Sequence, residues 1–270
     1  MTNSNNSQVI LQANHLVKTY SQNSGRFGFG QTQIKALDDV SITLKAGSTL
    51  AIVGESGSGK STLARCLLQL QPLDSGEVLF QGKNLAQLDA KSLRAERKNL
   101  QMVFQDPFAS LNPRMRVGEI VGEGLLIHDL GSADAQKNKV YQMLERVGLK
   151  ANDALKYPHQ FSGGQRQRIG IARALVLEPK VVVCDEPVSA LDVSVQAQIL
   201  LLLKELQREM NLSYLFISHD LRVVRHIAEE MVVMHKGKIV EQGNVVEIYN
   251  APKQPYTKQL LSAIPGRKAA

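Results

Sequence analysis

The chain has no apolar run long enough to cross a bilayer. Its longest, ILLLL at residues 199–203, falls far short of the roughly 20 residues that a membrane-spanning helix needs. The first ten residues, MTNSNNSQVI, lack the basic and apolar regions that are typical of a signal peptide. Hydrophobic residues at 43% and charged residues at 21% are ordinary for a globular protein. We therefore expect a cytosolic chain of one or two domains.

Cysteine is also scarce. Only Cys66 and Cys184 occur in 270 residues, and each lies in an apolar context. Their wide separation argues against a disulfide framework or a metal cluster, and we expect two buried thiols. The net charge of +7 is scattered along the chain rather than gathered in blocks. It therefore gives only weak support for a nucleic-acid or anionic-lipid partner.

Hydrophobic patterning divides the chain into three stretches. Short β-like runs and turn signals up to about residue 80 predict an antiparallel layer that feeds one buried strand at residues 50–53. Strand signals are sparse at residues 85–157, where two segments have helical spacing and predict a mostly helical insertion. Ser132 is the expected N-cap of the second segment. Its apolar stripe consists of Val140, Leu144 and Val147.

After the insertion the pattern alternates helix and strand. The expected elements are a helix at 165–177, a strand at 181–184, a helix at 195–210 and a strand at 214–218. Such alternation predicts a mainly parallel sheet covered by helices. A hairpin is expected to turn at Lys236 and Gly237.

A glycine-rich stretch, residues 21–35, contains GRFGFG and is long for a hairpin connection. It has two interpretations. One is a mobile surface loop, and the other is a contact with a partner or a membrane.

The sequence GESGSGKST at residues 54–62 fits the pattern of a phosphate-binding loop, with a buried strand before it and a helix after it. Glycines let backbone N–H groups turn inward to phosphate oxygens, and the helix N-terminus adds partial positive charge. Lys60 can reach the β and γ phosphates, and Ser61 can ligate Mg²⁺. The expected nucleotide-binding residues here are Gly54, Glu55, Ser56, Gly57, Ser58, Gly59, Lys60, Ser61 and Thr62.

Two acidic residues are suited to the hydrolysis of a nucleotide bound at the phosphate loop. In VVVCDEP, an apolar strand delivers Asp185 and Glu186 at its carboxyl end, where open α/β sheets bind ligands. Asp185 is suited to the Mg²⁺ shell, and Glu186 to orienting or deprotonating the attacking water. The alternative is a structural acidic pair that ends a strand.

A second glycine-containing stretch, FSGGQRQRIG at residues 161–170, also precedes a helix. Alone, its SGG is an N-cap followed by a turn. Together with the phosphate loop it becomes a second candidate anion site. Its residues are Ser162, Gly163, Gly164 and Gln165.

With these motifs in order, the chain resembles the ATP-binding subunits of ABC transporters almost from end to end. FSGGQ is similar to the family's signature motif, commonly LSGGQ, with Phe161 as a departure. Gln105 matches the Q-loop, His219 the switch histidine, and Asp192 ends SALD, which matches the D-loop. Tyr20 lies where the adenine-stacking aromatic of the family is expected.

Three of these residues also have a plain structural interpretation. Tyr20 can be core packing, Gln105 an ordinary loop amide, and His219 a hydrogen-bonded histidine at a strand end.

The resemblance implies one ABC ATPase domain with the α/β fold of a P-loop NTPase, including an N-terminal antiparallel β subdomain. Residues 1–105 and 163–236 would form the β and RecA-like core, 106–162 the helical subdomain, and 237–270 the C-terminal hairpin and tail. ATP and Mg²⁺ are the implied cofactors. Implied catalytic residues are Glu186, His219 and Gln105, and implied metal ligands are Ser61, Gln105 and Asp185.

Family members pack head to tail as dimers. The resemblance therefore implies that Ser162 and Gly164 bind the γ phosphate of ATP held by a partner cassette. Gly164→Asp is then expected to block closure of the dimer while it spares the chain's own nucleotide binding. The helical subdomain would pass the movement to membrane subunits.

Two further stretches resemble the di- and oligopeptide permease branch of bacterial importers. They are FQDPFASLNPRM at residues 104–115 and QPYTKQLLSAIP at 254–265. Nickel, antimicrobial-peptide and glutathione systems share this branch. Some members carry a C-terminal iron–sulfur cluster, which we do not expect here because the tail has no cysteine.

This branch implies a peripheral subunit on the cytoplasmic face of the inner membrane. Its partners would be a second ATPase of different sequence, with which the chain forms a heterodimer, two transmembrane permease subunits, and a periplasmic or lipid-anchored substrate-binding protein. No nucleic-acid partner is expected. No residue of the chain identifies the transported substrate.

Two other functions compete with this interpretation. A soluble ABC ATPase acting on ribosomes or DNA would suit the basic charge, but such proteins usually carry two cassettes or a long coiled coil. A P-loop kinase would leave His219 and the SGGQ stretch unexplained.

Overall fold

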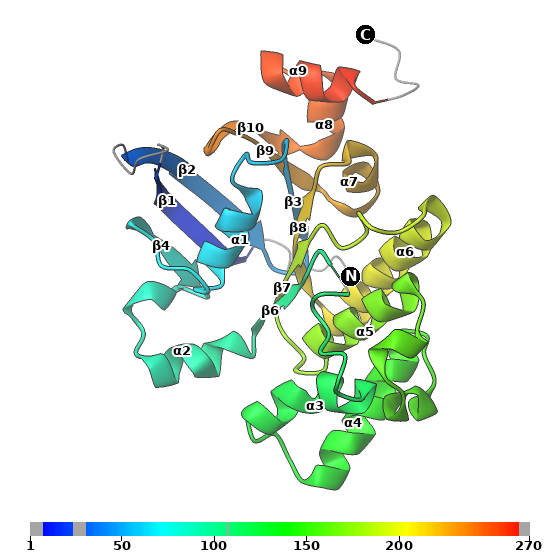
Figure 1. The fold of residues 1–270 in the computed structure, drawn as a ribbon. Coiled ribbons are helices and arrows are strands. Elements are labelled where there is room, and N and C mark those ends of the chain that lie inside the picture. The colour runs from blue at the N-terminus through cyan, green and yellow to red at the C-terminus, as the bar shows by residue number, and fades with distance from the viewer. Residues whose placement is uncertain (1–7, 24–30, 107, 265–270) are drawn as a thin grey trace, which may run out of the picture. The chain divides into compact units, whose positions relative to one another are not determined.

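The computed structural model of the chain describes residues 8–23, 31–106 and 108–264. The chain divides into two compact units. One comprises Met1–Leu88 and Leu215–Ala270, and the other comprises Asp89–Tyr214. We call them the outer unit and the inserted unit. Figure 1 shows their helices and strands.

An antiparallel sheet begins the outer unit. Its order is β2-β1-β4-β5, and its strands are β1 (Val9–Asn23), β2 (Gln31–Lys45), β4 (Ser75–Phe80) and β5 (Lys83–Asn84). The register pairs Ala13 with Ile42 on one side and with Val78 on the other. All three side chains are buried. The predicted antiparallel layer is thus confirmed.

The remaining strands of the outer unit follow the order β10-β9-β3-β8. They are β3 (Thr49–Val53), β8 (Ser213–Ser218), β9 (Glu230–His235) and β10 (Lys238–Asn244), and β8 belongs to the outer unit from Leu215 onward. Strand β3 runs parallel to β9, with Ile52 opposite Val232. The β9–β10 hairpin turns at Lys236 (φ 47°) and Gly237 (φ 79°), as predicted.

Helices cover these strands. They are α1 (Lys60–Leu67), α7 (Leu221–Ile227), α8 (Val245–Asn250) and α9 (Pro255–Ser262). A short 3₁₀ turn (Leu85–Gln87) ends the N-terminal part. Leu261 of α9 is fully buried in a cluster that includes Ala51 and Val53 of β3. The C-terminal segment therefore packs against the strand that leads into the phosphate loop.

The inserted unit is mainly helical. Its helices are α2 (Ala90–Arg97), α3 (Val117–Ile127), α4 (Ala133–Arg146), α5 (Gly163–Leu175) and α6 (Val193–Met210), with 3₁₀ turns at Ala151–Leu155 and Pro158–Gln160. Ser132 caps α4 through Ala135 N–H, as expected. The predicted stripe of Val140, Leu144 and Val147 is buried.

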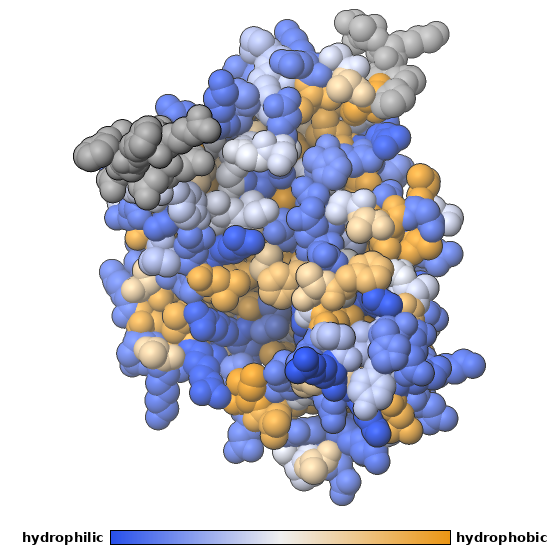
Figure 2. Space-filling view, viewed as in Figure 1, coloured by the Kyte–Doolittle hydropathy of each residue, from blue (hydrophilic) through white to orange (hydrophobic). Residues whose placement is uncertain are grey.

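Two parallel strands complete this unit, β6 (Leu100–Val103) and β7 (Val181–Asp185). They pair with Leu100 opposite Val181. The sequence around β6 has few strand signals. Apolar side chains also reach the surface over α3, where Leu126 is 73% exposed. Figure 2 shows apolar patches among hydrophilic residues in this lower part of the view.

Cys66 and Cys184 are both buried, as predicted. The glycine-rich connection is shorter than expected, because Ser21 and Gln33 are paired strand residues. Residues 24–30, which contain all of GRFGFG, lie outside the described residues. No helix in the described part of the chain is long and apolar enough to cross a membrane.

Candidate ATP-binding and hydrolysis site

The phosphate loop connects the buried strand β3 to helix α1 in the outer unit. The side chain of Lys60, which is only 5% exposed, turns back into this loop. Its Nζ donates to the carbonyl oxygens of Gly54 and Glu55, each at 2.8 Å. The ammonium group is therefore held at the centre of the loop by backbone oxygens. An anion that entered the loop would meet a cation already in place.

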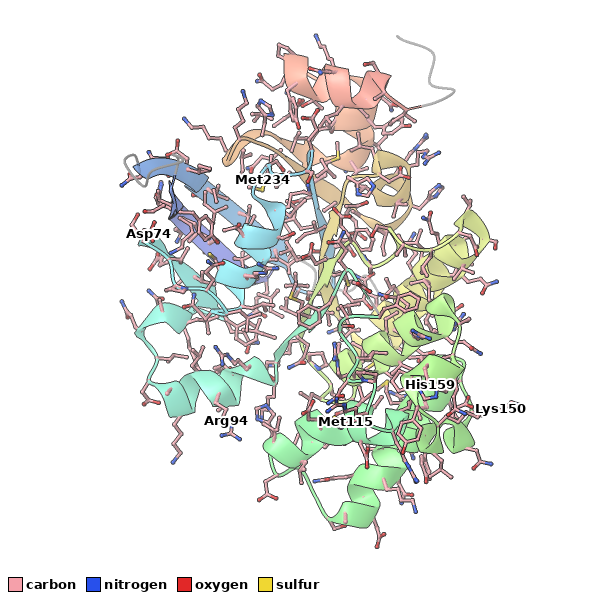
Figure 3. The ribbon with its side chains drawn as sticks, viewed as in Figure 1. Asp74, Arg94, Met115, Lys150, His159 and Met234 are labelled. Atoms are coloured by element: carbon pink, nitrogen blue, oxygen red, sulfur yellow. The ribbon has the colours of Figure 1, made fainter. Side chains whose placement is uncertain are left out.

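Two glycines of the loop are required by close backbone packing. A Cβ at Gly54 would collide with the carbonyl oxygen of Met234 at the end of β9, and one at Gly59 with that of Ala36 on β2. Gly59 also has φ 107°, which other residues rarely adopt. Figure 3 labels Met234 beside α1. A Cβ at Gly57, in contrast, would meet no described atom within 4 Å.

Helix α1 starts without a side-chain cap at its N-cap residue, Gly59. The first backbone N–H groups of a helix need partners from outside the helix, and a phosphate group can provide them. Ser58 is 4% exposed, and among the described residues its hydroxyl has no hydrogen-bond partner. Ser61 and Thr62 lie in the first turn, half-buried. The loop thus has the form of an anion cradle.

Tyr20 lies on β1 in the same unit, with 36% of its surface exposed. The strand is fixed next to it by Asp74, which accepts from Lys18 Nζ at 2.8 Å and from Thr19 N–H at 2.6 Å. The Lys18 ammonium, and then the Thr19 N–H, lower the pKa of Asp74. Tyr20 therefore presents a ring at the surface from an anchored strand. The core-packing interpretation of Tyr20 fits this exposure poorly.

His219 follows the buried strand β8 and is exposed. The next residue, Asp220, is the N-cap of α7 and pairs with Arg222 at 2.7 Å. Hydrogen bonding to Arg222 lowers the pKa of Asp220. His219 is therefore placed between a buried strand and a capped helix, which fixes its backbone.

The inserted unit contributes the carboxylates at the end of β7. Asp185 is 5% exposed, and Glu186 is half-buried and has φ 47°. This left-handed conformation is uncommon for glutamate, and such backbone strain is concentrated at functional sites. Gln105, which follows β6, donates from Nε2 to Glu186 Oε2 at 3.2 Å. The structure therefore brings together two of the three predicted catalytic residues.

The signature stretch forms the N-terminus of α5 in the inserted unit, with Ser162 as its N-cap. Gln165 N–H donates to Ser162 Oγ at 3.3 Å, and Ser162 N–H donates to Gln165 Oε1 at 3.0 Å. This is a complete capping box. The Ser162 hydroxyl accepts a bond in the cap, so its own hydrogen can still be donated to an anion outside the helix.

Gly164 and Asp192 link this loop to α6. A Cβ at Gly164 would lie 2.6 Å from Val195 Cγ1. Asp192 caps α6 by accepting from Val195 N–H at 2.9 Å, and this bond is the main reason that its pKa is lowered. The expected effect of Gly164→Asp is therefore corrected in one respect. The substitution would crowd Val195 as well as add a negative charge. A loss of dimer closure in this variant could therefore come from either effect.

Two arginines of α5 were not singled out by sequence analysis. Arg166 donates to the carbonyl oxygen of Phe161 at 3.0 Å, and its guanidinium lies 4.3 Å from the ring centre of Phe108. Arg173 lies 5.5 Å from the ring centre of Phe104, and burial lowers its pKa. Their spacing of seven residues places them on one side of a helix, which was the available signal. They connect the segment around Gln105 to the signature helix.

The predicted site residues thus fall into two groups. The phosphate loop, Tyr20 and His219 belong to the outer unit, whereas Gln105, the end of β7, the SGGQ stretch and Asp192 belong to the inserted unit. Oxygen donors suited to a hard cation such as Mg²⁺ occur in both groups. They are the hydroxyl of Ser61, the amide of Gln105 and the carboxylate of Asp185.

Comparison with protein families matches residues 37–189 to the family described as ABC transporter. The chain is 54% identical over 269 residues to the oligopeptide transport ATP-binding protein OppF of Haemophilus influenzae, and the match covers 98% of the chain and 81% of the relative. It is 52% identical over 258 residues to the dipeptide transport ATP-binding protein DppF of Escherichia coli, covering 96% and 77%.

Solved structures give a consistent picture. A dimeric structure of the ATP-binding cassette MJ0796, in a post-hydrolysis state bound to ADP and Pi, matches with a TM-score of 0.77 at 30% identity, covering 87% of the chain and 99% of that structure. CbiO1 of Clostridium perfringens, part of an ABC transporter complex, matches with a TM-score of 0.78 at 30% identity, covering 91% and 92%.

Proposed function

Because the chain belongs to the ABC transporter family of ATPases, we propose that it is the ATP-hydrolysing subunit of an importer of dipeptides or oligopeptides. One observation carries this proposal. Relatives named for oligopeptide and dipeptide transport are more than 50% identical to nearly the whole chain. These matches cover 98% and 96% of the chain, so they are not confined to the nucleotide motifs that all ATPases of this family need.

ATP would bind first to the outer unit. The phosphates would occupy the loop at residues 54–62, where Lys60 exchanges its two backbone carbonyl partners for phosphate oxygens. The adenine ring would stack on the exposed face of Tyr20. Mg²⁺, which neutralises phosphate charge when bound, would be held by Ser61, Gln105 and Asp185.

Hydrolysis would use the residues at the end of β7. Glu186 would accept a proton from the water that attacks the γ phosphorus, while its hydrogen bond from Gln105 keeps the carboxylate oriented. His219 would donate a hydrogen bond to the γ phosphate and help to keep the water in line. Gln105 would report the state of the nucleotide to the helical segment at residues 106–162.

The SGGQ stretch would act on a partner's nucleotide. The hydroxyl of Ser162 and the N-terminus of α5 would complete the anion site around ATP bound by a second cassette, and Asp192 would lie at the same dimer interface. ATP would hold the two cassettes together, and hydrolysis would release them. We infer that the partner is a second ATPase of different sequence, and that the pair works with two permease subunits and a substrate-binding protein at the cytoplasmic face of the membrane.

Transport assays test this function directly. The assembled transporter in vesicles should take up labelled di- or oligopeptide when ATP is present, and Glu186→Gln should reduce ATP turnover about 100-fold or more while ATP binding is retained. Glu178→Gln is the matched control, because Glu178 also has a positive φ (54°) but is an exposed residue paired with Lys139. Unchanged turnover in Glu186→Gln would contradict the assignment of the base.

Glutathione is the second candidate substrate. The glutathione import ATP-binding protein GsiA of Salmonella typhi is 50% identical over 258 residues, although the match covers only 41% of that longer relative. Uptake of labelled glutathione, with no uptake of di- or oligopeptides, would favour this alternative and leave the ATPase mechanism unchanged.

A further inference from the structure

The C-terminal helix α9 reaches the phosphate loop through one side chain. Glu55, the second residue of the loop, donates its backbone N–H to the hydroxyl of Tyr256 at 3.1 Å. Tyr256 is the second residue of α9 and lies 201 residues from Glu55 in sequence. We propose that Tyr256 is a positioning residue for ATP binding, which holds the phosphate loop in shape once Lys60 turns to the phosphates. This inference rests on the proposed ATP site.

The tyrosine ring is itself held in place. The ring of His235, the last residue of β9, lies 3.9 Å from the Tyr256 ring, centre to centre. Met234, the residue before it, contacts the loop at Gly54. Strand β9 and helix α9 therefore approach the phosphate loop together. The hydroxyl of Tyr256 is presented to Glu55 by a ring that packs against His235 at an interplanar angle of 38°, rather than by a free surface side chain.

Helix α9 is anchored independently of this contact. Both oxygens of the Glu241 carboxylate accept backbone N–H groups at its start, from Lys253 at 2.8 Å and from Gln254 at 3.1 Å. At its other end Leu261 is fully buried in the cluster that contains Val53, the residue before the loop. Figure 1 shows α9 beside α8 at the end of the chain described here. The helix is thus a rigid support for Tyr256.

The two backbone groups of Glu55 have different partners. Its N–H donates to Tyr256, and its carbonyl oxygen accepts from Lys60 Nζ at 2.8 Å. When Lys60 moves to the phosphates, the carbonyl loses that bond and keeps the one from Ser58 N–H at 3.2 Å, which lies within the loop. Tyr256 then fixes Glu55 from outside the loop. Tyr256 should therefore stabilise the nucleotide-bound loop more than the empty loop. An effect on affinity follows, rather than one on folding alone.

The test removes only the hydroxyl. Tyr256→Phe keeps the ring against His235, and Tyr249→Phe is the control, since Tyr249 packs against the same core cluster with its ring on Arg225. In the full chain with Mg²⁺, titration with a fluorescent ATP analogue should show affinity about threefold to tenfold weaker for Tyr256→Phe, the range for one lost hydrogen bond. The control should bind as the wild type does.

Two further measurements separate positioning from simple structural support. The melting temperature without nucleotide should stay within about 2 °C of wild type. Amide hydrogen exchange in α9 should slow on ATP binding in the wild type but not in Tyr256→Phe, because linkage is reciprocal. Unchanged affinity in Tyr256→Phe would overturn the inference, whether or not its melting temperature falls. Absence of ATP binding by the wild type would instead overturn the proposed ATP site, and this inference with it.

Discussion

Helices α1 and α5 both start after a glycine-containing turn, but their N-termini are completed in different ways. Helix α1 starts at Gly59 without a side-chain cap, and Lys60 lies buried in the loop before it. Helix α5 starts at Ser162 with a complete capping box to Gln165. One N-terminus has no side-chain cap, and the other is partly satisfied by its own chain.

The difference bears on what each site can bind. The loop before α1 brings together a buried cation and an uncapped helix, so it can surround a phosphate chain alone. Helix α5 has its first N–H groups partly occupied, and Ser162 adds one hydroxyl hydrogen. We infer that such a site does not hold a nucleotide alone. It can complete the surroundings of a phosphate that another protein already holds.

The largest expected effect is at the phosphate loop. Lys60→Ala should weaken ATP binding by the isolated chain about 100-fold, because a charge-assisted bond to phosphate is lost together with the positive charge. Titration with a fluorescent ATP analogue measures the affinity. Lys83→Ala, at an exposed lysine of the same unit, is the control. Affinity within threefold of wild type would remove the basis for calling this loop the chain's own nucleotide site.

A smaller effect is expected where α5 packs against α6. Gly164→Ala should lower the free energy of unfolding by about 1–3 kcal/mol, because the added methyl group lies 2.6 Å from Val195 Cγ1. Val195→Ala in the same chain should restore much of the loss, and urea unfolding of the single and double variants measures it. Equal loss in the single and double variants would show that crowding by Val195 is not the cause.

Much of the fold could be predicted from local sequence. The hairpin at Lys236 and Gly237, the cap at Ser132 and the buried strand after Thr49 all follow from turn chemistry, capping and apolar runs, which act over a few residues. The phosphate loop could be predicted for a related reason. Its chemistry requires glycine, lysine and serine at fixed spacing, and few other functions do.

Features that depend on distant partners could not be predicted in this way. Strand β6 has only four residues, including the polar Gln101, and it is defined by its pairing with β7. The contact of Tyr256 with Glu55 joins positions 201 residues apart. The conflict between Gly164 and Val195 likewise depends on the approach of two helices. No local pattern encodes such contacts, because they exist only once the chain has folded.

Ser162 provides the most direct test of the central claim that α5 acts on a partner's ATP. Ser162→Asp and Ser162→Asn both keep a good N-cap, so they differ mainly in charge. In the Glu186→Gln chain, the ATP affinity of the isolated chain should change less than twofold in either variant, the smallest effect predicted here. ATP-dependent association with the partner ATPase, measured by analytical ultracentrifugation, should be lost with aspartate and kept with asparagine. Association that survives Ser162→Asp, or ATP affinity of the isolated chain that falls tenfold, would contradict the account.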